Sequence, residues 1–291
     1  QEENIQLKDP FQEVGITHFY LTYQGLQDRI LQETVARFYR PFLPETIPLT
    51  QIKQNKLRIG FISRYFSKHS VTDYYFRLIE QLPREHFQVS LLAAPGLQTD
   101  HVTYALKKCA DEFIHLPSNL SLARELIARK GLDILVYPDI GQESFTYFLS
   151  FTRLAKVQCA LLGFPITTGI PTIDYFISSA LFEPPHAQDH YIETLIALPR
   201  IQANYLRPDI PLKPKTRSEL SLSKEVHLYV CPMNLMKVHP ELDSDLAKIL
   251  KEDPLGQICF FQYHQTFLHD RLHHRFQNTI PSVANRIKFF P

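Results

Sequence analysis

Short apolar runs alternate with amphipathic stretches along most of the chain, and this alternation predicts its fold. The run Leu57–Ile62 is typical of a buried strand, and Val71–Leu82 follows it with apolar side chains on one helical face. The same pattern then predicts the strands Phe87–Ala94, Ile114–Leu116, Asp133–Tyr137, Val157–Leu162, Asp174–Ser178 and Thr194–Leu198, and the helices Val102–Phe113 and Ser121–Lys130. Repeated strand–helix units of this kind indicate an α/β fold, a mainly parallel sheet covered on both faces.

A second strand–helix series begins after the proline-rich stretch Pro208–Pro214. It predicts the strands Val226–Cys231, Ile258–Gln262 and Arg286–Phe290, and the helices Pro240–Leu250 and Thr266–Phe276. The series is short beside the roughly 100 residues that a doubly wound domain needs. We therefore interpret it as about half of a second domain, so that the chain is a fragment. A small self-contained second domain is the alternative.

The opening 50 residues predict a helical segment and a linker. Ile30, Leu31, Thr34, Val35 and Phe38 recur at helical spacing. Prolines at positions 41, 44 and 48 then end this helix and stiffen the chain that leads to the first strand.

Charge and cysteine usage exclude several classes of protein. The 31 basic residues nearly balance the 30 acidic ones, so an extended surface for nucleic acid or an anionic membrane is not expected. No apolar stretch is long enough to cross a bilayer, and the N-terminus lacks the pattern of a signal peptide. Cys109, Cys159, Cys231 and Cys259 lie far apart without CxxC spacing. A soluble protein of the cytoplasm is the interpretation that these features favour.

Two polar residues follow predicted strands, where parallel sheets bind their ligands. His69 lies in the loop after Leu57–Ile62, just before a helix, and could contact an anion or a sugar hydroxyl. Asp139 follows Asp133–Tyr137 and could orient a hydroxyl or accept a proton. A surface histidine and an aspartate that caps a turn are the structural alternatives.

The loop after Val157–Leu162 combines a flexible backbone with hydroxyl groups. Gly163 permits a close backbone approach, Pro165 stiffens the turn, and the hydroxyls of Thr167 and Thr168 suit hydrogen bonds to a sugar or phosphate. A purely structural turn is an equal alternative.

Lysine and histidine side chains in the second series suggest two further sites. Lys237 follows Val226–Cys231 and would face a cleft between the two series, where it could neutralise a pyrophosphate leaving group. A surface lysine is the alternative. The histidines at 264, 269, 273 and 274 include one pair four residues apart, but no HExxH pattern accompanies them. A solvated helix is favoured there over a metal site.

Taken together, these motifs resemble the catalytic region of the O-GlcNAc transferase family, glycosyltransferase family 41. More narrowly, the chain is similar to bacterial relatives joined to tetratricopeptide repeats. The motifs that carry the resemblance are Phe19–Gly25, Leu57–Ser63, Leu162–Gly169, Ile173–Ile177, Asn234–Lys237 and His239-Pro240.

The resemblance implies a GT-B fold, in which two Rossmann-like domains face each other across a cleft. We expect a helical segment and linker over residues 1–50, a Rossmann-like catalytic domain over 51–212, and a partial nucleotide-binding domain over 213–291. Members of the family transfer a sugar, GlcNAc or a hexose, from a UDP-sugar to protein Ser or Thr, or to Asn in one branch. The transfer inverts the sugar and needs no metal or other cofactor.

The resemblance also implies roles for single residues. His69 matches the histidine that lines the donor-sugar pocket, and Gly163 and Pro165 match the loop that contacts the sugar. Asn234 and Lys237 match the pair near the uridine and the pyrophosphate. The expected partners are therefore a UDP-sugar and an acceptor protein, with tetratricopeptide repeats upstream.

One expected motif is absent from the sequence. The Gly- and Thr-rich segment that holds the nucleotide phosphates in this family would lie beyond Pro291. We therefore expect this chain alone to bind UDP weakly and to turn over little sugar. An inactive family member that serves as a protein-binding scaffold is the alternative function.

Overall fold

Two units make up the chain in the computed structural model, Gln1–Arg207 and Pro208–Pro291. The structure describes residues 7–203, 205, 210, 212–220, 222–262 and 266–290. Each unit is built around a parallel sheet of its own.

Seven parallel strands form the sheet of the first unit, in the order β3-β2-β1-β4-β5-β6-β7. The strands are β1 (Leu57–Ser63), β2 (Phe87–Ala93), β3 (Glu112–His115), β4 (Ile134–Tyr137), β5 (Val157–Leu161), β6 (Tyr175–Ser179) and β7 (Thr194–Leu198). This confirms the predicted parallel sheet, with strand bounds that differ from those expected by one or two residues. The strand order reverses between β1 and β4, and such a switch point opens a crevice at the carboxyl ends of the strands.

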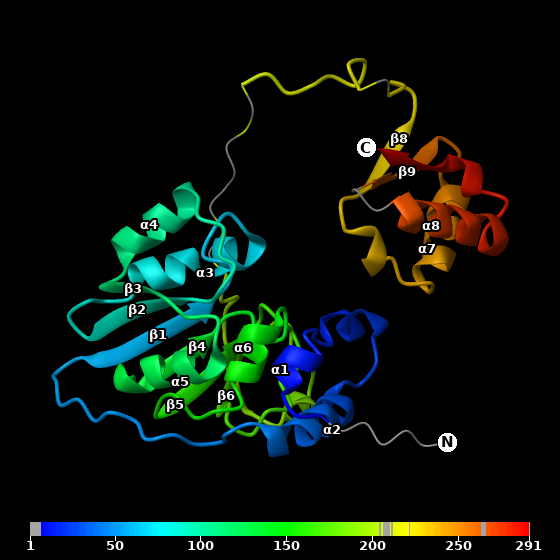
Figure 1. The fold of residues 1–291 in the computed structure, drawn as a ribbon. Helices are drawn as coiled ribbons and strands as arrows, with labels where there is room; N and C mark the ends of the chain where they lie inside the picture. Colours follow the sequence, from blue (N-terminus) through cyan, green and yellow to red (C-terminus); the bar gives the residue numbers. More distant parts are fainter. Residues whose placement is uncertain are drawn as a thin grey trace, which may run out of the picture. The chain divides into compact units, whose positions relative to one another are not determined.

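Helices cover both faces of this sheet (Figure 1). Helices α3 (Ser70–Gln81) and α4 (His101–Cys109) lie on one face, and α5 (Leu120–Arg129) and α6 (Ser144–Leu149) lie on the other. Because strand side chains alternate in direction, neighbouring residues of β1 enter different cores. Phe61 packs with the α3 side of the sheet, whereas the next residue, Ile62, packs with the α5 side.

The structure refines the prediction for α5 and adds α6. Asn119 caps α5, two residues before the predicted start of the helix at Ser121, because its Oδ1 accepts a hydrogen bond from the Leu122 backbone N–H at 3.0 Å. Gly131 follows that helix with φ = +55°, a conformation that ends helices. Helix α6 was not predicted. Five of its six residues are buried, so it has no polar face that would produce a helical period in the sequence.

The N-terminal segment packs onto the first unit. It contains α1 (Pro10–Glu13), a 3₁₀ turn η1 (Phe19–Gln24), the predicted helix α2 (Arg29–Tyr39) and the turn η2 (Arg40–Phe42). The Phe11 ring of α1 meets the Phe145 ring of α6 edge-on, with 5.9 Å between the centroids.

Helix α2 buries a different face from the one that its apolar spacing suggests. Ile30 and Phe38 are 71% and 50% exposed, whereas Gln32, Ala36 and Tyr39 are buried. The Tyr39 ring meets Phe148 of α6 edge-on at 5.2 Å, so contacts with the sheet unit orient the helix.

Three parallel strands form the sheet of the second unit, in the order β10-β9-β8. The strands are β8 (His227–Cys231), β9 (Gly256–Phe261) and β10 (Ile287–Phe290), and the helices are α7 (Leu242–Glu252) and α8 (Thr266–Thr279). Every element predicted for this part of the chain is present. Its core contains Leu250, Phe260 and Phe276, one from each of α7, β9 and α8.

Two further findings concern helix length and thiol chemistry. Across the described residues, none of the helices has the length and apolar character that a bilayer-spanning segment requires. All four cysteines are free thiols.

Candidate functional site

Three loops of the first unit are locked together at the carboxyl end of its sheet. Ser63 ends β1, and its Oγ donates a hydrogen bond to Asp139 Oδ2, just beyond β4, at 3.0 Å. Gly163 follows β5, and its N–H donates to the Pro138 carbonyl oxygen at 3.0 Å. The Ser63–Asp139 bond spans the point between β1 and β4 where the strand order reverses. The structure therefore brings together three positions that span 100 residues of the sequence, from Ser63 to Gly163.

His69 is held in this region as a neutral hydrogen-bond donor. It caps α3, and its Nδ1 accepts a hydrogen bond from the Val71 backbone N–H at 3.3 Å. Its ring stacks on Tyr65 with 4.1 Å between the centroids. Burial lowers the pKa of His69, although nearby Asp73 opposes that shift. Because Nδ1 accepts a bond, the single ring proton belongs on Nε2, which can donate to a ligand.

Asp139 is buried, where it links the loop after β4 to the end of β1 through Ser63. Its side chain is 0% exposed, and burial raises its pKa well above the ordinary range, with Glu143 adding to the shift. A carboxyl group without solvent access, already bonded to Ser63, does not suit the role of proton acceptor that the sequence suggested.

The two threonines of the Gly163–Gly169 loop point inward. Thr167 and Thr168 are each 1% exposed, and both hydroxyls donate to the Glu193 carboxylate, at 2.6 and 2.5 Å. The Thr168 backbone N–H donates to the same carboxylate at 2.8 Å. The prediction that these hydroxyls bind a sugar or phosphate is therefore wrong for this structure, because Glu193 already occupies them.

Glu193 is the residue that sequence reasoning missed. It is 1% exposed and lies directly before β7. A single glutamate ahead of an apolar run has no sequence signal that points to threonines 25 residues earlier. The pair of adjacent threonines was the only hint, and it indicated hydroxyl chemistry without showing its direction.

The rest of the same loop is anchored by an aromatic contact. Phe164 is buried, and its ring stacks on Phe19 of η1 with 5.7 Å between the centroids. Gly141 leaves room for that ring, because a Cβ at this position would collide with it. Pro165 is exposed and lines a hollow of about 240 Å³ with residues 25–29, so it belongs to the outer side of the loop.

Replacing Gly163 with alanine is expected to disrupt the locked loops. A Cβ there would collide with the Pro138 carbonyl oxygen and lie 3.0 Å from the Asp139 Cα, and backbone atoms cannot move aside cheaply. We expect the free energy of unfolding of the first unit to fall by about 2 to 3 kcal/mol. Gly25→Ala is the control for backbone strain alone, because nothing lies within 4 Å of its Cβ while its φ of +66° disfavours alanine. Equal unfolding midpoints for the two variants in urea would contradict the close packing.

Lys237 projects from a capped turn in the second unit. The turn η4 (Leu235–Lys237) follows β8, and Asn234 Oδ1 accepts from the Met236 N–H at 3.1 Å. Leu235 and Val238 are buried on either side, whereas Lys237 is exposed. The turn thus anchors its apolar residues and presents the lysine at the carboxyl end of β8. Asn234 acts here as the cap of this turn.

Two histidines of α8 lie next to each other on the helix. The rings of His269 and His273 stack with 6.0 Å between their centroids, and His269 Nδ1 lies 2.9 Å from Asp270 Oδ1. In the part of the chain that the structure describes, no group of three or more His, Cys, Asp and Glu side chains could hold a metal ion. His264 lies outside the described residues.

Comparison with known proteins places this fold and these loops in one family. The model of glycosyl transferase family 41 matches residues 40–204, which is more than half of the chain. The chain belongs to this family. That result confirms the resemblance to the O-GlcNAc transferase family.

The relatives bear names of protein glycosyltransferases. The chain is 29% identical over 282 residues to "Probable UDP-N-acetylglucosamine--peptide N-acetylglucosaminyltransferase SPINDLY" of Arabidopsis thaliana, covering 92% of this chain and 30% of that protein. It is 26% identical over 216 residues to "Probable UDP-N-acetylglucosamine--peptide N-acetylglucosaminyltransferase SEC" of Arabidopsis thaliana, which covers 72% of this chain and 22% of that protein. It is 31% identical over 128 residues to the UDP-glucose:protein N-beta-glucosyltransferase of Actinobacillus pleuropneumoniae, covering 42% and 20%. The chain thus spans less than a third of each relative.

A solved structure shares the fold. A mutant of the O-GlcNAc transferase of Thermobaculum terrenum superposes with a TM-score of 0.75 at 22% identity. The match covers 94% of this chain and 54% of that one, and it confirms the predicted GT-B type of fold.

Proposed function

We propose that this chain is part of a UDP-sugar-dependent protein glycosyltransferase. Its family and the names of its relatives support a transferase that acts on protein. The observation that carries the proposal is the set of locked loops after β1, β4 and β5, with neutral His69 beside them. Such a site offers a hydrogen-bond donor and close backbone to a sugar, at the switch point where α/β sheets bind ligands.

The proposed reaction is a single displacement at the anomeric carbon of the sugar. A hydroxyl of Ser or Thr, or the side-chain amide nitrogen of Asn, attacks from the face opposite UDP. The bond from the anomeric carbon to the UDP oxygen breaks, so the configuration inverts, and the acceptor proton passes to a base. Asp139 does not suit that role, because its side chain is fully buried and bonded to Ser63.

Lys237 is the proposed partner of the leaving group. Negative charge develops on the β-phosphate as the sugar departs, and a fixed ammonium group stabilises that charge most in the transition state. A lysine in this position removes the need for a metal ion. We therefore propose a metal-independent reaction with Lys237 at the pyrophosphate and His69 at the sugar, which is GlcNAc or a hexose.

The setting of the reaction completes the proposal. Four free thiols support a reducing compartment, so we place the protein in the cytoplasm. The partners are a UDP-sugar and an acceptor protein, and tetratricopeptide repeats upstream would present the acceptor. The balanced charge gives no reason to propose a nucleic acid as a partner.

Sugar transfer by a His69→Phe variant of the full-length protein tests the proposal. Phenylalanine keeps the stacking on Tyr65 but removes the Nε2–H donor, together with the Nδ1 acceptor of the Val71 N–H. We expect kcat/KM for the UDP-sugar to fall about tenfold, the scale of one hydrogen bond in a water-poor site. His101→Phe is the control, because that histidine is exposed at the start of α4. An unchanged kcat/KM for His69→Phe would remove His69 from the site.

The pH dependence of the same reaction gives a second check. The lowered pKa keeps His69 neutral at and above neutral pH, so its contribution stays constant between about pH 7 and 8. Acidification below its pKa protonates Nδ1, which then can no longer accept from Val71. We expect the rate of the wild-type protein to fall on that acid side. The fall should be smaller in His69→Phe, and identical pH profiles would contradict this assignment.

No transfer from any UDP-sugar by the wild-type protein would favour the protein-binding alternative.

A further inference from the structure

The turn that carries Lys237 is held at its far end by a residue of another helix. Asn234 caps the beginning of η4, but the end of the turn needs a separate anchor. Val238, the residue after Lys237, is buried, and its carbonyl oxygen accepts a hydrogen bond from Arg275 Nη1 at 3.0 Å. Arg275 lies on α8, 37 residues later. The backbone next to Lys237 is therefore attached to α8.

Arg275 is in turn fixed by a carboxylate of α7. Its Nε lies 3.1 Å from Asp243 Oδ2, and its Nη2 lies 2.8 Å from Asp243 Oδ1. This fork-to-fork pair sets the plane of the guanidinium group, so Nη1 can point only towards Val238. The guanidinium group of Arg275 also packs over the ring of Phe276, with 5.2 Å between its central carbon and the ring centroid.

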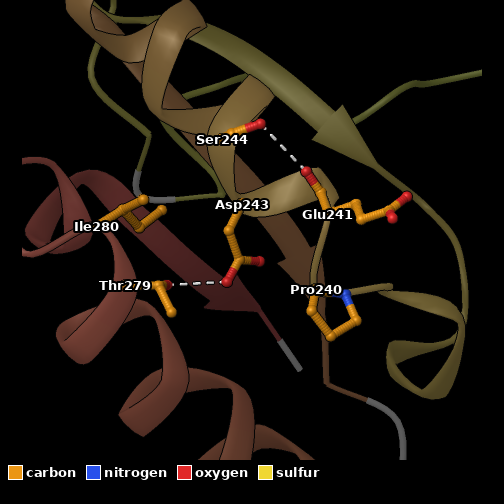
Figure 2. Close-up of a pocket in the computed structure, with 6 residues that line it drawn as sticks. All are labelled: Pro240, Glu241, Asp243, Ser244, Thr279 and Ile280. Atoms are coloured by element: carbon orange, nitrogen blue, oxygen red, sulfur yellow. Dashed lines mark hydrogen bonds between the residues drawn. The ribbon is translucent and has the colours of Figure 1, made fainter.

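Asp243 is engaged completely by its neighbours. It is 4% exposed, and Thr279 Oγ1 of α8 donates to its Oδ2 at 2.8 Å (Figure 2). Figure 2 shows the carboxylate pointing from the start of α7 towards Thr279. A hollow of about 370 Å³ lies here, lined by Pro240, Glu241, Asp243, Ser244, Thr279 and Ile280. Because both oxygens of the buried carboxylate already have partners, the group serves to orient Arg275 and not to bind a ligand.

We propose that Arg275, oriented by Asp243, is a positioning residue that holds Lys237 against the UDP leaving group. The proposal rests on the function proposed for Lys237 above. A three-residue turn has few bonds of its own, so its geometry depends on its two ends. Electrostatic stabilisation requires a charge that is already in place before the reaction, and displacements of about 1 Å can cost about 10²-fold in rate. Arg275 supplies that rigidity without touching the substrate.

The variant Arg275→Lys tests this role in the full-length protein. Lysine keeps the charge near Asp243, but it lacks the planar fork that reaches Asp243 and Val238 together. We expect kcat for sugar transfer to fall about 10- to 100-fold, with KM for the acceptor protein unchanged. Hydrogen exchange at the amides of residues 236–238 should become faster. Wild-type exchange there together with a wild-type kcat would overturn the proposal.

A matched control lies in the same unit. Arg286 is also half-buried and bonds backbone carbonyls, including Asp253 O at 2.7 Å, but at the opposite end of the sheet from Lys237. Arg286→Lys should lower stability to a similar degree while it leaves kcat and the exchange at residues 236–238 unchanged. An equal loss of kcat in Arg286→Lys would show that Arg275 acts only on stability, and would overturn the proposal.

Combination with Lys237→Ala separates this inference from the proposed function. If Arg275 acts through Lys237, then Arg275→Lys causes little further loss of kcat in a Lys237→Ala background. An undiminished further loss would overturn the positioning role alone. If Lys237→Ala itself leaves kcat unchanged, the role of Lys237 fails and the positioning role fails with it. If Lys237→Ala lowers kcat but Arg275→Lys does not, only the positioning role fails.

Discussion

Replacing Lys237 with alanine in the full-length protein is expected to lower kcat for sugar transfer by about 10²- to 10³-fold. Lys237 lies on a turn whose flanking residues Leu235 and Val238 are buried, so the backbone that carries the lysine is held in place beforehand. Its loss leaves the charge that develops on UDP without that partner. Rates with saturating UDP-sugar measure the effect on the reaction, and calorimetry with UDP measures the accompanying loss of affinity.

Lys248→Ala is the matched control for this prediction. Lys248 belongs to the same unit, on α7, and its Nζ pairs with Asp245 Oδ1 at 3.1 Å on the exposed surface. Such an exposed pair contributes little, so both kcat and the affinity for UDP should stay close to wild type. If both lysine variants had the same kcat, Lys237 would not be the partner of the UDP leaving group.

Replacing Glu193 with alanine is expected to lower the free energy of unfolding of the first unit by about 3 to 5 kcal/mol. The buried carboxylate accepts from Thr167 Oγ1, from Thr168 Oγ1 and from the Thr168 N–H. Its removal leaves these donors without partners in a site that excludes water, and each unsatisfied group carries a cost. Urea unfolding followed by a probe in the first unit measures this change.

The same substitution should also weaken donor binding. Glu193 bonds Thr167 in the second half of the Gly163–Gly169 loop. The first residue of that loop, Gly163, packs against the backbone of Pro138 and Asp139. We therefore expect KM for the UDP-sugar to rise in Glu193→Ala. Glu125→Ala is the control, since Glu125 is exposed on α5 and pairs with Arg129 at 3.0 Å. If Glu193→Ala unfolds at the same urea concentration as Glu125→Ala, the loop does not depend on this carboxylate.

Part of the candidate site could be read from residue order alone. His69, Gly163 and Lys237 each follow a short apolar run, and the ends of parallel strands are where α/β proteins bind ligands. That placement depends only on the local alternation of strands and helices. The directions of the side chains did not follow from it. Thr167 and Thr168 face Glu193, and Asp139 Oδ2 faces Ser63, because the chain brings these partners from distant positions in the sequence.

The same division holds for the fold. The sequence by itself determined the strands, the long helices and the parallel sheets, since hydrophobic periodicity and glycine stops such as Gly131 act over a few residues. Only the tertiary structure decided which face α2 buries, that α6 is a helix, and which bonds Arg275 and Glu193 make. A buried polar group must find its partner wherever the chain brings one, and no local period records that choice.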